Sequence, residues 1–366
     1  MKFWDHQISA RRQTRRLLRV FALAVLLLVA GVHSALVLAW WLMAAVLPVH
    51  LGFPAGFLVT NIGVSLLLVL GGWWVETANL RAGGFLLAQR MGARAARPAL
   101  SHAEQRLCNI VDELCIAAHM RRPQVMVLPR TDAINAFAAG WDEADAVVAV
   151  TEGALQWLTR DELQGMVAHE LSHLHEGDTR LNMRLGGMVF GLELVYHFGE
   201  AVRERGGLAW WFGSAIMLAG LAGWLTGRLL KAAVSRQREF LADARAVQWT
   251  RSRDGLGGVL RKVMAQRRST AQAPERSHYG NLSHPALQHL LLVDATQHSA
   301  LERRLDSHPP LEVRVQRIYG RMMSPLPLVP VPDTPEPAYE RAATVGIAVP
   351  GAASLASQAD PFARFL

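Results

Sequence analysis

The segment His169-Glu170-Leu171-Ser172-His173 combines residue types whose spacing suits metal-dependent hydrolysis. Residues four apart stack on the same face of an α-helix, so the imidazoles of His169 and His173 can bind one metal ion together. Glu170 lies one step round the helix, where its carboxylate can act as a general base on a metal-bound water. Because H-E-x-x-H is a short pattern, the surrounding sequence must supply supporting context.

Residues just after this segment are possible third ligands. They are His175, Glu176 and Asp178. A metzincin would have glycine at position 176 and histidine at position 179, where this chain has glutamate and threonine. The pattern therefore favours a third ligand from a distant part of the chain.

Two distant carboxylates, Glu239 and Asp243, offer that ligand. They are four apart in a segment that we predict to be helical, so they share one face. One carboxylate could bind the metal while the other orients a metal-bound imidazole. Glu239 also lies close to Arg236 and Arg238, so an ordinary solvated helix charge is an equal alternative on these residues alone.

Capping patterns predict the helices that would position these residues. Thr159-x-x-Glu162 begins one helix and Gly177 ends it, which places the H-E-x-x-H segment on a helix. The same pattern at Ser101-x-x-Glu104 begins an earlier helix. Between the two helices, a small sheet is predicted from β-prone runs at 125–128, 134–138 and 146–150.

Long apolar runs predict membrane helices in this chain of 366 residues, of which 51% are hydrophobic. Runs at about 20–47 and 57–75 approach or exceed the roughly 20 residues that span a bilayer. The first run is longer than the apolar region of about 7 to 15 residues in a cleaved signal peptide, and no small-x-small cleavage site closes it. We therefore expect an uncleaved anchor that forms a membrane hairpin.

Flanking charges predict the topology of these spans. Lysine and arginine flank the hairpin at both ends and are missing from its loop, so the positive-inside rule places both ends in the cytoplasm. A third run at 210–230 should return from outside, which requires an outward segment at 185–199. That segment contains Glu193 and His197, so it is either a span with a functional carboxylate or an interfacial helix.

Charge and cysteine content argue against two other classes of protein. The net charge is +8, but the arginines adjoin apolar runs instead of forming a patch interleaved with aromatic residues, so no nucleic-acid partner is expected. Cys108 and Cys115 are seven apart, which indicates two core thiols on one helix face and no disulfide framework.

Four blocks, taken in order, resemble those of the HtpX-like membrane metallopeptidases and their relatives, the zinc CAAX prenyl proteases. Residues 135–140 resemble the family's N-A-F-A-x-G segment, and 161–178 its zinc helix. Residues 235–243 match its S-R-x-R-E-F-x-A-D block, and 308–314 its H-P-P-L-x-x-R block. The resemblance covers roughly residues 1–320, and four ordered blocks are far more specific than one.

The resemblance implies an α+β fold with a gluzincin-type peptidase domain, mostly helical with a small sheet, and about four transmembrane helices. It implies one Zn²⁺ ion bound by His169, His173 and Glu239, with Glu170 as the base. Asn135 and the strand at 145–150 would line a cleft in which a peptide adds as an extra strand.

The same resemblance gives less specific roles to three other residues. Asp243 and Arg314 are expected behind the metal ligands or in substrate binding. His308 could approach the metal or the oxyanion, with a purely structural role in the His-Pro-Pro turn as the alternative.

The predicted organisation has five parts. They are a membrane hairpin and linker (1–100), the first half of the peptidase domain with the zinc helix (101–180), a second helix pair in or at the membrane (181–234), the second half of the peptidase domain (235–323) and a flexible Pro/Ala-rich tail (324–366).

The expected function is that of a zinc endopeptidase in the bacterial inner membrane, with its termini and active site facing the cytoplasm. Its expected substrates are membrane or misfolded polypeptides. The alternatives are a narrow protease for lipidated or C-terminal peptides, and a non-proteolytic zinc-containing scaffold or chaperone. A purely structural zinc site has no use for Glu170, which favours the enzyme.

Overall fold

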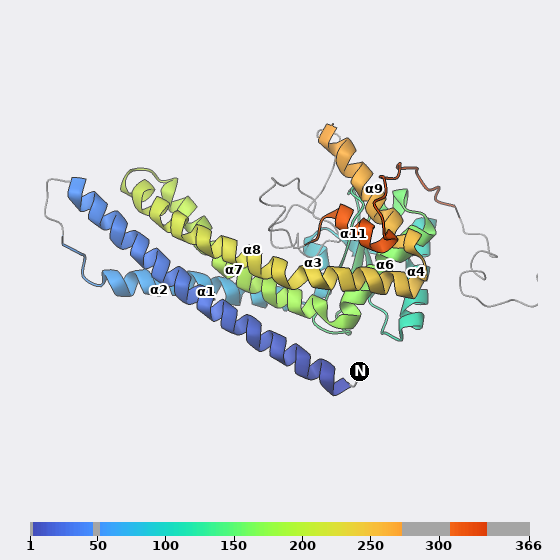
Figure 1. Cartoon of the computed structure of the whole chain (residues 1–366), viewed down its shortest axis with the longest axis horizontal. Coiled ribbons are helices and arrows are strands. Elements are labelled where there is room, and N and C mark those ends of the chain that lie inside the picture. Colours follow the sequence, from blue (N-terminus) through green and yellow to red (C-terminus); the bar gives the residue numbers. More distant parts are fainter. Residues whose placement is uncertain (1–2, 47–51, 273–307, 335–366) are drawn as a thin grey trace, which may run out of the picture.

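The computed structural model describes residues 3–46, 52–272 and 308–334. Long helices extend to one side of a domain that contains a four-stranded sheet (Figure 1). The prediction of a mostly helical chain with a small sheet is confirmed.

Four long helices lie together, largely outside the sheet domain, which only the last of them enters for half its length. They are α1 (Phe3–Val46), α2 (Phe57–Leu80), α7 (Asp178–Arg203) and α8 (Gly207–Thr250). Helix α7 packs against α8 and α2, and α1 packs against the same two helices. The end of α1, the start of α2 and the turn between α7 and α8 all lie at the end farthest from the sheet domain (Figure 1).

Three of these helices are long and apolar enough to cross a membrane. They are Leu18–Val46, Phe57–Leu80 and Gly207–Thr250. The predicted run at 210–230 lies inside α8, which continues for 44 residues and carries Glu239 and Asp243 into the sheet domain. Helix α7 has 26 residues, so it is longer than the predicted segment at 185–199, but its charged residues keep it below the hydropathy of a span. Four spans therefore remain a prediction.

Glycines let α7 approach α2 and α8 closely. A β-carbon at Gly191 would lie 2.4 Å from the Val69 carbonyl oxygen of α2, and one at Gly187 would lie 2.5 Å from Thr77 Oγ1. A β-carbon at Gly213 of α8 would lie 2.4 Å from the backbone nitrogen of Arg203. Such short separations exclude any side chain, so these glycines set the distance between the helices.

The sheet contains β1 (Arg94–Ala95), β2 (Gln124–Leu128), β3 (Ala136–Ala139) and β4 (Val147–Thr151), in the order β1-β2-β4-β3. Strands β2 and β4 are parallel, and the two outer strands are antiparallel to their neighbours. The three predicted strands are confirmed within about two residues of their bounds.

The strand order corrects one expectation about peptide binding. The predicted cleft used the strand at 145–150, which corresponds to β4. Strand β4 is hydrogen-bonded to β2 on one side and to β3 on the other, so its backbone has no free edge for a further strand. Strand β3 is the edge strand on this side of the sheet.

Six shorter helices lie in the described part of the domain. They are α3 (Gly84–Arg90), α4 (His102–Ala118), α5 (Glu152–Trp157), α6 (Arg160–Glu176), α9 (Arg253–Gln272) and α11 (Leu311–Tyr319). Helix α6 packs against α4, α8, α9 and β3. The main core cluster joins α4, α6, α9 and the sheet through buried residues such as Ile110, Val148, Met166 and Val259.

Local sequence signals explain where α6 begins and ends. The Thr159 side chain accepts a hydrogen bond from the Glu162 backbone, and the Glu162 carboxylate accepts one from the Thr159 backbone. Gly177 ends the helix with a φ of 72°, a conformation that glycine adopts at little cost. Because Asp178 begins α7 directly after this glycine, α6 and α7 are joined by a single sharp turn.

Residues 324–334 are attached to the domain, although the predicted tail begins at 324. The Val331 backbone nitrogen donates to the Gln156 carbonyl at 2.8 Å, and the Leu326 nitrogen donates to the Arg261 carbonyl at 3.2 Å. The Asp333 carboxylate accepts a 2.5 Å hydrogen bond from the Ala103 nitrogen in the first turn of α4. The rest of the predicted tail lies outside the described residues.

Candidate metal centre

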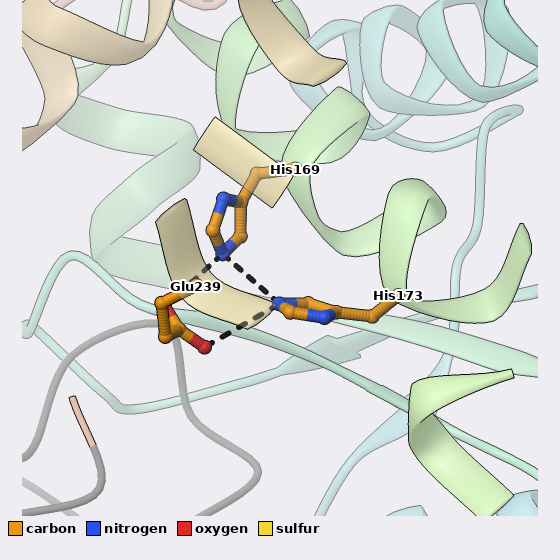
Figure 2. A group of neighbouring side chains, drawn as sticks. All are labelled: His169, His173 and Glu239. Carbon is orange, nitrogen blue, oxygen red and sulfur yellow. Dashed lines mark hydrogen bonds and ion pairs between the residues drawn. The ribbon is translucent and has the colours of Figure 1, made fainter. Parts of the chain in front are cut away.

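Helices α6 and α8 bring three potential ligands together inside the domain. The Nε2 atoms of His169 and His173 lie 3.2 Å apart. The Glu239 carboxylate lies 3.5 Å from each of these nitrogens, through Oε2 to His169 and through Oε1 to His173 (Figure 2). Within the described chain, these three residues are the group whose ligand atoms could bind a metal ion, all within 4.8 Å of one another.

Asp243 lies behind His169 on the side away from the other ligands. Its Oδ1 is 3.1 Å from His169 Nδ1, so the carboxylate can hold the imidazole with Nε2 facing Glu239. Asp243 is one helical turn beyond Glu239 on α8, as their spacing in the sequence predicts. The structure therefore places both residues of the pair at the same centre.

Arg314 of α11 joins the two α8 carboxylates. Its Nε and Nη2 atoms donate to Asp243 at 3.0 and 2.6 Å, and its Nη1 lies 3.3 Å from Glu239 Oε2. The side chain has no solvent exposure. Although burial lowers the pKa of Arg314, the carboxylates of Asp243 and Glu239 raise it above the ordinary value, so the guanidinium is charged. It balances part of the negative charge of the site.

Asp178 gives His173 a partner that corresponds to Asp243. The Asp178 Oδ2 is 3.0 Å from His173 Nδ1, and Arg238 of α8 forms an ion pair with the same carboxylate. From the sequence, Asp178 is predicted only as a possible third ligand. The position of Asp178 directly after Gly177 could have indicated its contact with His173, because the turn at Gly177 brings the first residue of α7 back toward the last turns of α6.

Glu170 lies beside both histidines on α6 and is 2% exposed. Burial raises the pKa of its carboxyl group above the ordinary value, while the neighbouring imidazoles act in the opposite direction. A carboxylate with a raised pKa holds a proton more tightly once it has accepted one. This property suits a group that takes a proton and releases it later.

His308 lies next to Glu239, with its Nδ1 atom 3.3 Å from Glu239 Oε2. Within the described part of the chain, both ring nitrogens are buried and have no hydrogen-bond partner. The contact places the His-Pro-Pro turn at the candidate metal centre, which leaves His308 close enough to contribute to it. Whether the ring contacts a metal or substrate stays a prediction.

Asn135 contacts the sheet. Its backbone nitrogen donates to Thr151 Oγ1 at 3.0 Å, and its side-chain oxygen accepts a hydrogen bond of 3.0 Å from the Ala136 nitrogen. These bonds fix the start of the edge strand β3. The structure thus assigns Asn135 a position at the strand that borders the site, with its role in substrate binding still a prediction.

The donor set is consistent with a bound metal ion. Two imidazoles and a carboxylate converge, and each imidazole has its other nitrogen beside a second carboxylate, which is a common arrangement around metal-ligating histidines. The Glu239 Oε2 atom is buried and accepts no hydrogen bond from the described residues. Arg314 Nη1 lies 3.3 Å from this oxygen, and a metal ion would give it a direct ligand bond and add to the balance of the acidic groups.

This combination of paired histidines, a carboxylate from another helix and a buried glutamate is typical of metal-dependent peptidases. The sequence pattern of peptidase family M48 matches residues 101–322, and the chain belongs to this family.

Several of its relatives are described as protease HtpX homologs. The relative from Dictyoglomus turgidum is 34% identical over 233 residues, which cover 59% of this chain and 69% of the relative. The relative from Streptococcus thermophilus is 29% identical over 315 residues, which cover 76% and 95%. No solved structure gives a significant match. The resemblance to HtpX-like metallopeptidases is therefore confirmed.

The contact between Asp178 and His173 leads to a prediction about metal affinity. We expect Asp178→Asn to weaken metal binding about 10- to 100-fold, because the amide holds the His173 ring less firmly and lowers its basicity. Competition with a chromogenic chelator measures the affinity. Asp161→Asn, an exposed aspartate at the start of the same α6 helix, is the matched control. Equal affinities for the two variants would contradict an orienting role for Asp178.

Proposed function

We propose that this protein is an integral-membrane zinc endopeptidase that hydrolyses peptide bonds of membrane or misfolded proteins. The observation that carries the proposal is the convergence of His169, His173 and Glu239 beside the buried Glu170 in a chain of family M48. Protease names among the relatives support a polypeptide substrate. We also propose the domain organisation predicted from the sequence, and the M48 match at 101–322 supports its peptidase part.

We propose zinc as the metal, and the ligand separations are compatible with it. Tetrahedral sites with metal–nitrogen distances of about 2.0–2.1 Å place two ligand nitrogens about 3.3–3.4 Å apart, close to the 3.2 Å between the two imidazoles. Three protein ligands leave a fourth position for water or substrate, as in catalytic sites. When bound, zinc polarises the scissile carbonyl and lowers the pKa of its water.

Glu170 is the proposed general base and, later, the general acid. Its carboxylate accepts a proton from the attacking water and passes it to the nitrogen of the leaving amine. The raised pKa that burial gives this group suits both transfers. Asp243 and Asp178 hold the rings of His169 and His173 in orientation. Arg314 balances part of the negative charge of the carboxylates.

The substrate is proposed to bind along β3. This strand is at the sheet edge and contacts α6, which carries Glu170, but its four residues are buried in the free protein, so a peptide could add there only after the residues that cover it move. A peptide in extended conformation can add to such an edge through main-chain hydrogen bonds, which gives affinity with little dependence on sequence. Asn135, fixed at the start of β3, is proposed to lie at one end of this binding strip.

Membrane association supports substrates that reach the site from the bilayer. Helix α8 runs from an apolar segment directly into Glu239, so the metal centre lies close to the end of a candidate span. We propose a four-span arrangement, with α7 as the remaining span, in the bacterial inner membrane. The termini and the active site would face the cytoplasm, as the arginines next to the apolar runs predict.

Two alternatives lead to different observations. A non-proteolytic scaffold would keep its function after loss of Glu170, since a structural metal site uses only its ligands. A narrow protease for lipidated or C-terminal peptides would not cleave unfolded proteins such as casein. The edge strand β3 favours the broad endopeptidase, because main-chain recognition does not select a terminus.

Metal content tests the proposed ligands directly. We expect the purified wild-type protein to contain one zinc ion per chain, and His173→Ala and Glu239→Ala to contain less than about a tenth of that after dialysis against a weak chelator, because only two ligands remain. Elemental analysis measures the amount and identity of the metal. His175→Ala, on the same helix but 39% exposed, is the control. Full zinc retention by Glu239→Ala would exclude this residue as a ligand.

A further inference from the structure

A cavity of about 750 Å³ lies between α1 and α2. One face of α1 lines it from Leu18 to His33, and α2 contributes Ile62, Leu66, Leu70 and Trp73. Apart from His33, the lining residues are aliphatic or aromatic. Leu26 and Leu70 on its walls are 66% and 42% exposed, so the cavity is open to the surroundings of the two helices. In a bilayer it would take up hydrocarbon.

The extent of the cavity limits what can occupy it. Its wall on α1 covers 16 residues, or about 22 Å at 1.5 Å per residue, which is less than the roughly 30 Å of a hydrocarbon core. Beyond it, the Trp40 ring lies against Phe53 and Phe57, and none of these three rings lines the cavity. A membrane-spanning helix would need a groove along the full core, whereas an acyl chain does not.

Arginines gather at the opposite end of these helices. Arg81 follows α2 directly and is exposed. Gly187 of α7 contacts Thr77 of α2. Arg184 on α7 and Arg81 after α2 each lie about one helical turn closer to the sheet domain than this contact. Arg180 lies a further turn along α7, and both Arg180 and Arg81 act electrostatically on Arg184. Arg180 Nε donates to the Trp141 carbonyl, and a bound anion would lower the repulsion that remains among the three guanidinium groups.

Trp73 connects the cavity to this arginine cluster. Its ring lines the cavity, and its Cδ1 atom lies 3.4 Å from the β-position of Gly187 on α7. Trp73 also packs against Phe21 of α1, with ring centroids 5.7 Å apart. Arg81 follows Trp73 by eight residues on the same helix and its cap, or about 12 Å. The charged cluster is therefore close to the end of the cavity nearer the sheet domain.

We propose that this region binds one anionic glycerophospholipid, with its phosphate against Arg81, Arg180 and Arg184 and one acyl chain in the cavity between α1 and α2. The apolar lining and length of the cavity select an acyl chain, and the positive cluster selects an anionic headgroup. The bound lipid would also join the α1–α2 hairpin to α7. This proposal requires only that α1 and α2 lie in a bilayer and is independent of peptide hydrolysis.

Lipid binding to the full-length protein in detergent tests the proposal. Native mass spectrometry would compare phosphatidylglycerol with phosphatidylcholine of the same acyl chains. We expect one phosphatidylglycerol to bind more tightly than phosphatidylcholine. Arg81→Gln combined with Arg180→Gln should weaken phosphatidylglycerol binding about thirtyfold, as expected for the loss of two arginines at a membrane surface. Arg205→Gln, an exposed arginine beyond the far end of α7, should leave it unchanged.

A second pair of variants tests the acyl-chain site. Ala22→Trp places a large ring in the cavity and should reduce binding of both lipids, whereas Leu23→Trp, on a surface of α1 outside the cavity, should not. If Ala22→Trp does not fold, Ala30→Phe makes the same test deeper in the cavity.

Equal affinity for the two lipids would overturn the proposal. Lipid binding that is unchanged in the arginine variant, or unchanged in the cavity variant, would also overturn it. Displacement of the lipid by a membrane-spanning polyleucine peptide would assign the cavity to a transmembrane helix and would overturn it as well. Loss of proteolysis in Glu170→Gln with lipid binding intact would leave it standing.

Discussion

Glu170→Gln is expected to lower kcat for casein or a membrane-protein substrate by about 10²- to 10⁴-fold, the contribution typical of a positioned acid–base group. The glutamine amide has nearly the same shape as the carboxylate, so the buried position of the side chain is kept, but it cannot accept a proton. The bound metal should stay at one per chain, because Glu170 is not among the three converging ligands.

The measurement is the initial rate of cleavage in detergent, with metal content determined on the same preparations. Glu176→Gln is the matched control, since this residue lies on the same helix and pairs with Arg245 near the surface. We expect its rate to stay within about twofold of wild type, because such surface pairs contribute little. If Glu170→Gln and Glu176→Gln were equally active, the assignment of Glu170 as the base would be lost.

The ligand-bearing helix could be predicted because its signals are local. The Thr159 and Glu162 cap, the helical spacing of the two histidines and the left-handed Gly177 are all encoded within one stretch of about 20 residues. The same is true of the Glu239 and Asp243 pair, whose shared face follows from a four-residue spacing. The geometry of a single helix places such residues on one face, so their proximity could be predicted without knowledge of the tertiary fold.

Features that depend on contacts between distant segments could not be predicted. The order of the strands places β4 inside the sheet and β3 at its edge, and no local pattern distinguishes the two because both are fully buried. The Gly177 turn places Asp178 near the last turns of α6, but its contact with His173 also depends on the angle between α6 and α7, which no local pattern gives. Strand β1 has two residues, too few for any periodicity to be visible.

The membrane helices show a mixed outcome for a physical reason. Composition alone finds α1, α2 and the first half of α8, because hydrocarbon requires long apolar runs. Helix α7 contains charged residues and packs against α2 and α8 through glycines, so part of its polar surface need not face lipid. The sequence therefore predicted only residues 185–199 of this 26-residue helix.

Arg314→Met is expected to destabilise the metal-free protein by about 3–5 kcal/mol, the range for removing one partner of a buried ion pair. The guanidinium has no solvent exposure and bonds Asp243 at 2.6 and 3.0 Å. Methionine fills most of the space but leaves the carboxylates of Asp243 and Glu239 buried without this cation. A loss of this size should lower the midpoint of thermal unfolding by roughly 10 °C for a domain of 150–250 residues.

Thermal unfolding in detergent with a chelator present measures this effect, and Arg317→Met on the same helix is the control. Arg317 is exposed and lies over the Phe240 ring, so its replacement should cost less than about 1 kcal/mol. Adding Asp243→Asn to Arg314→Met should restore part of the lost stability, because it removes one of the uncompensated charges. Metal should also narrow the gap between Arg314→Met and wild type, since a cation held by Glu239 supplies charge that the variant lacks. Equal midpoints for Arg314→Met and Arg317→Met without metal would show that Arg314 does not balance the charge of this site.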